Sequence, residues 1–208
     1  MDNQDLPQPR NFTLLAAVFE GGLAVVAVAL GWLVGLDPLE SFPRTPPDAA
    51  WGAAWGAAAA LPPAALLWLC LKRPVGPFAK LVRVVDELLV PLFRECRLLD
   101  LAVISALAGL GEEMLFRGVI QQAVADWVGG ERGIWVGLAL AALLFGLVHM
   151  ITPTYALLAG LIGLYLGWIW IATDRNLLVP IVTHAGYDFL ALVYLVKVRK
   201  RGSTMDDP

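Results

Sequence analysis

The segment GLGEEMLFRG, residues 109–118, places three ionisable side chains in a stretch that is otherwise almost wholly apolar. Glu113 and Arg117 are four residues apart, so on a helix they share one face, with the glutamate first, which is the favoured order for an ion pair. Glu112 lies about 100° around the helix and has no cation within one turn. The spacing predicts an ion pair beside a carboxylate that needs a partner from another part of the chain.

The two histidines of the chain are candidates for that partner. His149 follows Phe145 by four residues, and Asp188 follows His184 by four residues, so each pair shares one helix face. Both histidines lie within or at the edge of apolar segments, where an imidazole needs a carboxylate, a carbonyl group or water. Taken singly, each residue is better explained by packing. Together, six polar residues on three apolar segments carry a cost that leucines would avoid, which favours a buried polar site.

The composition indicates which elements position these residues. Of 208 residues, 59% are hydrophobic and 16% are charged, with a mean hydropathy of +0.71. A soluble domain is about half apolar and about a quarter charged. We therefore predict an all-α, polytopic membrane protein embedded in the lipid bilayer. The small net charge of −3 argues against nucleic acid as a partner.

About six transmembrane helices are predicted, each near the roughly 20 residues that cross a bilayer. They cover residues 12–36, 51–71, 99–128, 134–150, 155–172 and 177–198. Upright helices would hold His149 and His184 at different depths. Both can approach Glu112 only if the long third span is tilted or kinked, or if the backbone is irregular near His149.

An amphipathic interfacial helix is predicted between the second and third spans. Leu81, Val85, Leu88 and Leu92 recur there at helical spacing, and Pro91 is expected to bend the helix. Basic residues gather in this connector and near the C-terminus. The positive-inside rule therefore places both termini in the cytoplasm, of what we take to be a bacterial-type plasma membrane. We expect tails at 1–11 and 199–208 around a single membrane domain at 12–198.

Three motifs in succession, EExxxR, FxxxH and HxxxN/D, resemble those of the CPBP family of intramembrane proteases. This family includes type II CAAX prenyl endopeptidases and bacteriocin-processing or immunity proteins. The resemblance covers about residues 89–198, and the first two spans carry no matching motif. It implies an intramembrane endopeptidase without a cofactor, which acts on a membrane-embedded or lipid-modified peptide or protein through a glutamate-activated water.

The resemblance also implies the catalytic residues. Glu112 matches the glutamate that, with His149, holds and deprotonates the water. His184 and Asp188 match the pair that stabilises the oxyanion. Many relatives carry asparagine at the last position, and an ionised carboxylate cannot donate a hydrogen bond to an oxyanion. We therefore expect Asp188 to orient His184, as a triad aspartate orients its histidine.

Three further residues are expected to organise the site. Glu113 and Arg117 match the family's structural pair, and Phe145 belongs to the FxxxH motif. Because Glu113 has a cation beside it, we expect it to remain a fixed charge, whereas Glu112 is free to take a proton from water.

Other functions remain open from the sequence. Glu112, His149 and His184 form a two-histidine, one-carboxylate set that suits zinc or iron. The local HExxH arrangement is absent, and we favour a site without metal. A non-proteolytic scaffold or immunity protein of the same fold is a second alternative. A proton-coupled transporter is a third, which the lack of a visible inverted repeat disfavours.

Overall fold

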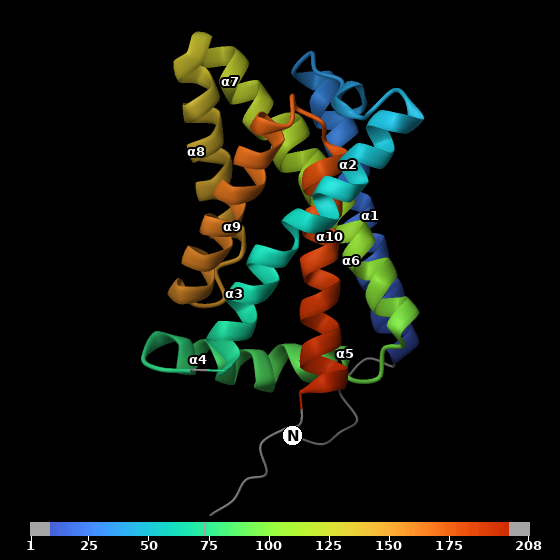
Figure 1. Cartoon of the computed structure of the whole chain (residues 1–208), viewed down its shortest axis with the longest axis vertical. Helices are drawn as coiled ribbons and strands as arrows, with labels where there is room; N and C mark the ends of the chain where they lie inside the picture. Colours follow the sequence, from blue (N-terminus) through green and yellow to red (C-terminus); the bar gives the residue numbers. More distant parts are fainter. Residues whose placement is uncertain (1–8, 73, 200–208) are drawn as a thin grey trace, which may run out of the picture.

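The computed structural model describes residues 9–72 and 74–199, and all regular elements in this part are helical (Figure 1). The predicted all-α fold is confirmed. Nearly all of the two predicted tails lies outside the described residues. In chain order the elements are α1 (Pro9–Leu33), the 3-10 turn η1 (Pro38–Ser41), α2 (Pro46–Ala59), α3 (Leu61–Lys72), α4 (Pro77–Val84), the π-helix η2 (Val85–Leu89), α5 (Val90–Phe93), α6 (Leu98–Glu113), the π-helix η3 (Met114–Gln121), α7 (Gln122–Val128), α8 (Gly130–Val148), α9 (Pro153–Ala172), α10 (Leu178–Val193) and the π-helix η4 (Tyr194–Val198).

Five helical segments in the described residues are long and apolar enough to cross a membrane: Phe12–Leu33, Pro46–Lys72, Gly130–Val148, Pro153–Ala172 and Leu178–Val198. They correspond to five of the predicted spans, and the chain is an integral membrane protein. The remaining span, predicted at 99–128, is a continuous helical run through α6, η3 and α7. It carries Glu112, Glu113 and Arg117, so it is less apolar than the other five.

The bundle is arranged around α10 (Figure 1). This helix contacts α6, α2, α3 and α9, while α1 packs along α6 and η3 reaches α8. α8 and α9 form a helical hairpin. The three motif-bearing segments, which are α6 with η3, the end of α8, and α10, therefore belong to one packed group of helices.

Glycines allow the backbones of this group to approach one another. A Cβ on Gly109 would lie 2.8 Å from the carbonyl oxygen of Ile181 in α10. A Cβ on Gly111 would lie only 2.2 Å from the carbonyl oxygen of Glu20 in α1. Small residues permit close helix packing of this kind in membranes. The turn of α6 before Glu112 is thus in direct contact with α1 on one side and α10 on the other.

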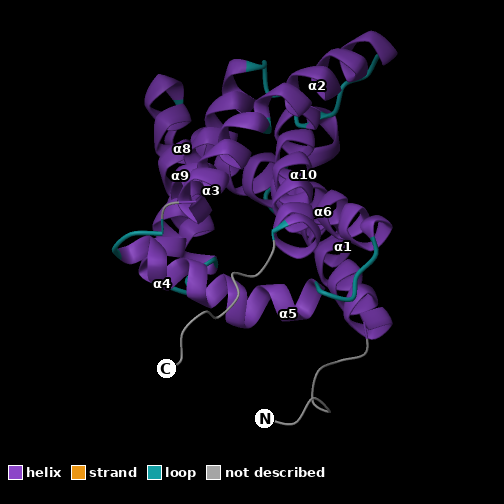
Figure 2. Ribbon diagram, turned by 60° about the horizontal axis from the view of Figure 1, so that its bottom comes forward, coloured by secondary structure: helices purple, strands orange, loops and turns teal. Residues whose placement is uncertain are grey.

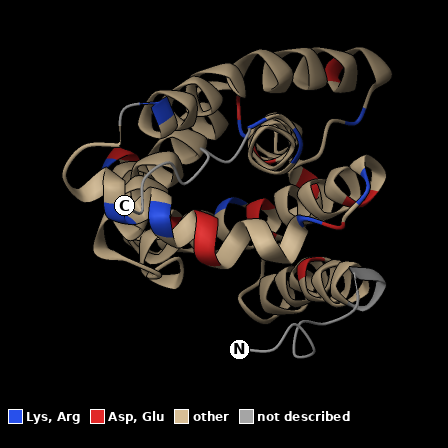
Figure 3. Ribbon diagram, turned by 90° about the horizontal axis from the view of Figure 1, so that it is seen from below, with Lys and Arg blue, Asp and Glu red and all other residues tan. Residues whose placement is uncertain are grey.

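The predicted amphipathic helix is formed by α4, η2 and α5, which cross the end of the bundle where α1 begins and α10 ends (Figures 1 and 2). Figure 3 looks onto this end and shows acidic and basic residues along the crossing segment. Leu81 and Val85 are buried against Leu195 of η4. Leu88, at the next position of the predicted apolar spacing, is 56% exposed.

The π-helix explains why Leu88 is exposed. Residues Val85–Leu89 form wider π turns directly before Pro91, whose ring cannot continue the α-helical hydrogen bonds. The wider turns advance the buried face by one residue. Val90 therefore takes the buried position after Val85.

The contact at Gly111 makes a prediction about stability. Gly111→Ala should lower stability by about 1–3 kcal/mol, because the added methyl group meets a backbone oxygen that cannot move aside without shifting α1. Gly22→Ala in α1 is the matched control, since its Cβ would meet nothing within 4 Å, and alanine favours the helix. Thermal unfolding of both purified variants in detergent measures the difference. Equal midpoints would contradict the packing described.

Candidate active site

A fully buried ion pair lies at the centre of the bundle. The side chains of Glu113 and Arg117 are both 0% exposed, and Nη1 of the arginine donates to Oε1 of the glutamate at 2.8 Å. The pair predicted from the i, i+4 spacing is therefore present. Nη2 of Arg117 donates to the carbonyl oxygen of Gly163 at 2.8 Å, which ties η3 to α9. The guanidinium carbon also lies 5.0 Å from the centre of the Phe145 ring.

His184 joins the same carboxylate from α10. Its Nδ1 donates to Oε1 of Glu113 at 2.7 Å, a contact that the spacing of the motifs did not predict. Its Nε2 lies 3.5 Å from Oδ2 of Asp188. The ring of Tyr187 stacks on the imidazole, with centroids 5.1 Å apart and 8° between the planes. We expected Asp188 to orient His184, but the shorter contact comes from Glu113.

Glu112 faces His149 across a gap. Nδ1 of His149 donates to the carbonyl oxygen of Phe145 at 2.7 Å, which leaves Nε2 directed toward the carboxylate. Nε2 lies 3.8 Å from Oε2 of Glu112. That oxygen has no hydrogen-bond partner among the described residues. The separation is too long for a direct hydrogen bond and is of the size that one bridging water can span.

Two irregular stretches of backbone adjoin these residues. The π-helix η3 begins directly after Glu113, and α8 ends at Val148, so that His149 leaves the helix with φ −95° and ψ 23°. Phe145, which is 2% exposed, lies with its ring centroid 4.5 Å from that of His149 and 6.0 Å from that of His184. Irregular backbone was expected near His149 and is present there, while the third span, which was expected to be tilted or kinked, contains a π-helix.

The structure adds Glu20 of α1 to this group. Its backbone carbonyl contacts the turn of α6 at Gly111, and its Oε2 is buried without a hydrogen-bond partner in the described part of the chain. Electrostatic interactions with Glu112, His149, His184 and Asp188 place it in the same polar group. The motif analysis missed it because the first span carries no family motif. The signal was nevertheless present, since Glu20 is the only charged residue at 12–36 and a lone carboxylate in an apolar span is costly.

Glu112, His149 and His184, the three ligands of the metal alternative, are not arranged around a common point in the structure. Among the residues that the structure describes, no group of three or more His, Cys, Asp or Glu side chains is arranged to hold a metal ion. His184, one of the three proposed ligands, directs both ring nitrogens at carboxylates, those of Glu113 and Asp188.

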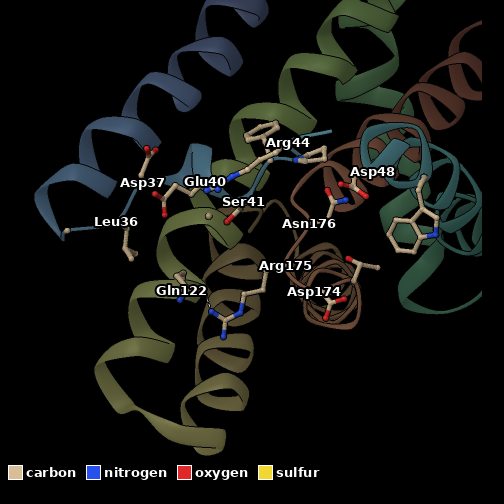
Figure 4. Close-up of a pocket in the computed structure, with 16 residues that line it drawn as sticks. Leu36, Asp37, Glu40, Ser41, Arg44, Asp48, Gln122, Asp174, Arg175 and Asn176 are labelled. Carbon is tan, nitrogen blue, oxygen red and sulfur yellow. Dashed lines mark hydrogen bonds between the residues drawn. The ribbon is translucent and has the colours of Figure 1, made fainter. Parts of the chain in front are cut away.

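A separate cavity of about 840 Å³ lies between η1, the start of α2 and the turn from α9 to α10 (Figure 4). Its lining combines apolar residues with charged residues of both signs, including Arg44, Arg175, Asp48 and Asp174. None of the motif residues lines it. It is therefore distinct from the polar cluster around Glu112.

Comparison with known proteins identifies the segment that carries this cluster. Residues 94–190 match the family described as type II CAAX prenyl endopeptidase Rce1-like. This segment, which is just under half of the chain, is similar to the Rce1-like family. The resemblance read from the three motifs is confirmed, and the matched residues run from before Glu112 to beyond Asp188. No curated protein and no solved structure gives a significant match.

Removing Arg117 should unfold part of the protein. Arg117→Ala would leave the carboxylate of Glu113 buried without its cation, which costs about 3–5 kcal/mol. We expect a lower folded yield in membranes, measured by size-exclusion chromatography after extraction. Arg175→Ala is the control, because Arg175 is exposed and surface changes usually stay within about 0.5 kcal/mol. A well-folded Arg117→Ala protein would rule out this structural role.

Proposed function

We propose that this protein is an intramembrane endopeptidase that hydrolyses a peptide bond with a water held by Glu112 and His149. The observation that carries the proposal is the 3.8 Å gap between Nε2 of His149 and Oε2 of Glu112. Both atoms are acceptors when the histidine donates from Nδ1 to the carbonyl of Phe145. One water can donate a hydrogen bond to each of them, and its lone pair then points away from both.

The reaction follows from this arrangement. Glu112 takes a proton from the water while the oxygen attacks the scissile carbonyl carbon, which forms a tetrahedral intermediate. The C–N bond then breaks, and Glu112 returns the proton to the leaving nitrogen. The cleaved products are a carboxylic acid and an amine, with one water consumed.

His184 supplies the group that stabilises the oxyanion. Its Nδ1 donates to Glu113 at 2.7 Å, and its Nε2, which lies 3.5 Å from Oδ2 of Asp188, is the ring nitrogen that a substrate oxygen would share with that carboxylate. Both ring nitrogens face carboxylate oxygens, and an imidazolium would satisfy both contacts. A cationic donor in a buried site stabilises a developing negative charge more strongly than it would in water. In this proposal Asp188 supports the charge of the ring rather than donating to the oxyanion itself.

The two adjacent glutamates differ because of their neighbours. Oε1 of Glu113 accepts hydrogen bonds from both Arg117 and His184. Oε2 of Glu112 has no such hydrogen-bond partner among the described residues and can accept a proton. In this proposal the carboxylate of Glu113 therefore has a structural role, and the carboxylate of Glu112 is the base.

The substrate that we propose is a membrane-embedded or lipid-modified peptide. The family description names prenyl endopeptidases that act on CAAX sequences, and a prenylated C-terminus would reach a site within the bilayer. The alternative is a non-proteolytic scaffold or immunity protein of the same fold. Membranes from cells with wild-type protein and with Glu112→Gln separate the two, because only a protease leaves uncleaved proteins accumulating in the variant.

The proposed base makes the central prediction. Glu112→Gln keeps the shape of the side chain but removes the proton acceptor, so cleavage of a prenylated CAAX peptide should fall by about 10²- to 10⁴-fold with folding nearly unchanged. His149→Ala should behave similarly. Glu113→Gln is the comparison, since it leaves Arg117 without its counter-charge and should lower stability as well. Substantial cleavage by Glu112→Gln would refute the assignment.

The same assay distinguishes the metal alternative. Purified wild-type enzyme should retain its activity after prolonged incubation with a strong chelator, because the proposed mechanism uses only side chains and water. Activity that is lost to the chelator and restored by zinc would favour the metalloprotease.

We also propose that both termini and the α4–α5 segment face the cytoplasm, as the distribution of Lys and Arg indicates. In a variant without Cys70 and Cys96, single cysteines at Ser203 and Arg83 should then resist a membrane-impermeant thiol reagent applied outside intact cells. A cysteine at Asp174, on the opposite side, should react and serves as the control. Labelling of either of the first two positions from outside would overturn this orientation.

A further inference from the structure

Glu20 lies beside Glu112 because α1 and α6 touch through their backbones. The carbonyl oxygen of Glu20 occupies the place where a Cβ of Gly111 would be. Glu112 is the next residue along α6. Glu20 also interacts electrostatically with Glu112, and with Asp188 from α10. Two carboxyl groups from different helices are therefore brought into one buried cluster.

The positive groups of the cluster are already engaged. Arg117 donates to Glu113, and His184 lies between Glu113 and Asp188. His149, the remaining titratable group near Glu20, uses its Nδ1 to donate to a backbone carbonyl. These cations balance the charges of Glu113 and Asp188. Arg117 also interacts electrostatically with Glu112, but its hydrogen bonds go to Glu113 and to the carbonyl of Gly163. Glu20 interacts with no Arg or Lys among the described residues.

The two carboxyl groups share a further property. One oxygen of each, Oε2 of Glu20 and Oε2 of Glu112, is buried without a hydrogen-bond partner in the described part of the chain. Two like charges in a site of low dielectric cannot both be held at little cost, so such pairs retain one proton between them. With one proton between them, Glu20 and Glu112 together carry a single negative charge.

We propose that Glu20 is a positioning residue that holds this proton, so that Glu112 remains the ionised carboxylate of the pair. This inference rests on the proposed function and extends it to a helix that carries no family motif. Glu20 keeps its own proton while Glu112 takes one from the water and returns it to the leaving nitrogen. A neutral Glu20 adds no negative charge beside the developing oxyanion.

The proposal has a specific consequence for pH. When the pH rises far enough for Glu20 to lose its proton, a second negative charge appears beside the oxyanion and cleavage should slow. Glutamine has nearly the shape of a protonated glutamate and cannot ionise. Glu20→Gln should therefore remain active. Its cleavage rate should still fall at low pH, where Glu112 becomes protonated, but should no longer fall at high pH. Glu20→Asp retains a carboxyl group, so its cleavage rate should still fall at high pH.

Infrared spectroscopy of the purified full-length protein tests the proton itself. At neutral pH the wild type should show the C=O stretch of a buried protonated carboxyl group, and Glu20→Gln should lose it. Glu40→Gln, in which an exposed carboxylate of η1 is replaced, is the control and should keep the band. The cleavage profiles of the same proteins are measured with a prenylated CAAX peptide.

The outcomes separate the two proposals. Retention of the infrared band in Glu20→Gln, an unchanged alkaline limb, or loss of cleavage at every pH in the folded variant would each overturn the role of Glu20. If Glu112→Gln still cleaves the peptide, the proposed base is wrong, while the infrared band continues to decide whether Glu20 holds a proton.

Discussion

Side chains from two other segments compensate the negative charge of the Glu113 carboxylate. Arg117 of η3 and His184 of α10 both donate to its Oε1, and all three side chains are almost or completely inaccessible. A buried charge without such partners destabilises a protein by several kcal/mol, so these contacts can form only together. Because Arg117 also donates to α9, one carboxylate fixes three helices relative to one another. The positions of His184 and of the neighbouring Glu112 depend on this contact.

Close backbone packing makes that contact possible. Gly109 and Gly111 let α6 lie directly against α10 and α1, and Gly163 of α9 offers its carbonyl to Arg117 while leaving space for Phe145. Larger side chains at these places would separate the helices by the width of a methyl group or more. The polar side chains would then no longer reach one another, since their hydrogen bonds tolerate only a few tenths of an ångström.

Departures from the regular α-helix give the site its geometry. The π-helix begins directly after Glu113, within the EExxxR motif, and the turn at His149 ends the FxxxH motif. A regular α8 would carry His149 onward along the helix axis, whereas the end of the helix lets its Nδ1 donate back to Phe145. Nε2 then faces Glu112. π-helices are rare and occur often at functional sites, which agrees with their place here.

The sequence by itself determined what depends on neighbouring residues. Hydrophobic length set the spans, and the i, i+4 spacing set the Glu113–Arg117 pair, because both follow from the geometry of a single helix. The order of the three motifs was enough to predict the family that residues 94–190 match. Residue spacing did not predict that His184 meets Glu113, that Glu20 joins the cluster, or that Leu88 is exposed. Each of these depends on how close two helices come or on one extra residue in a turn. Those distances are set by packing between segments far apart in the sequence, and only the tertiary structure decides them.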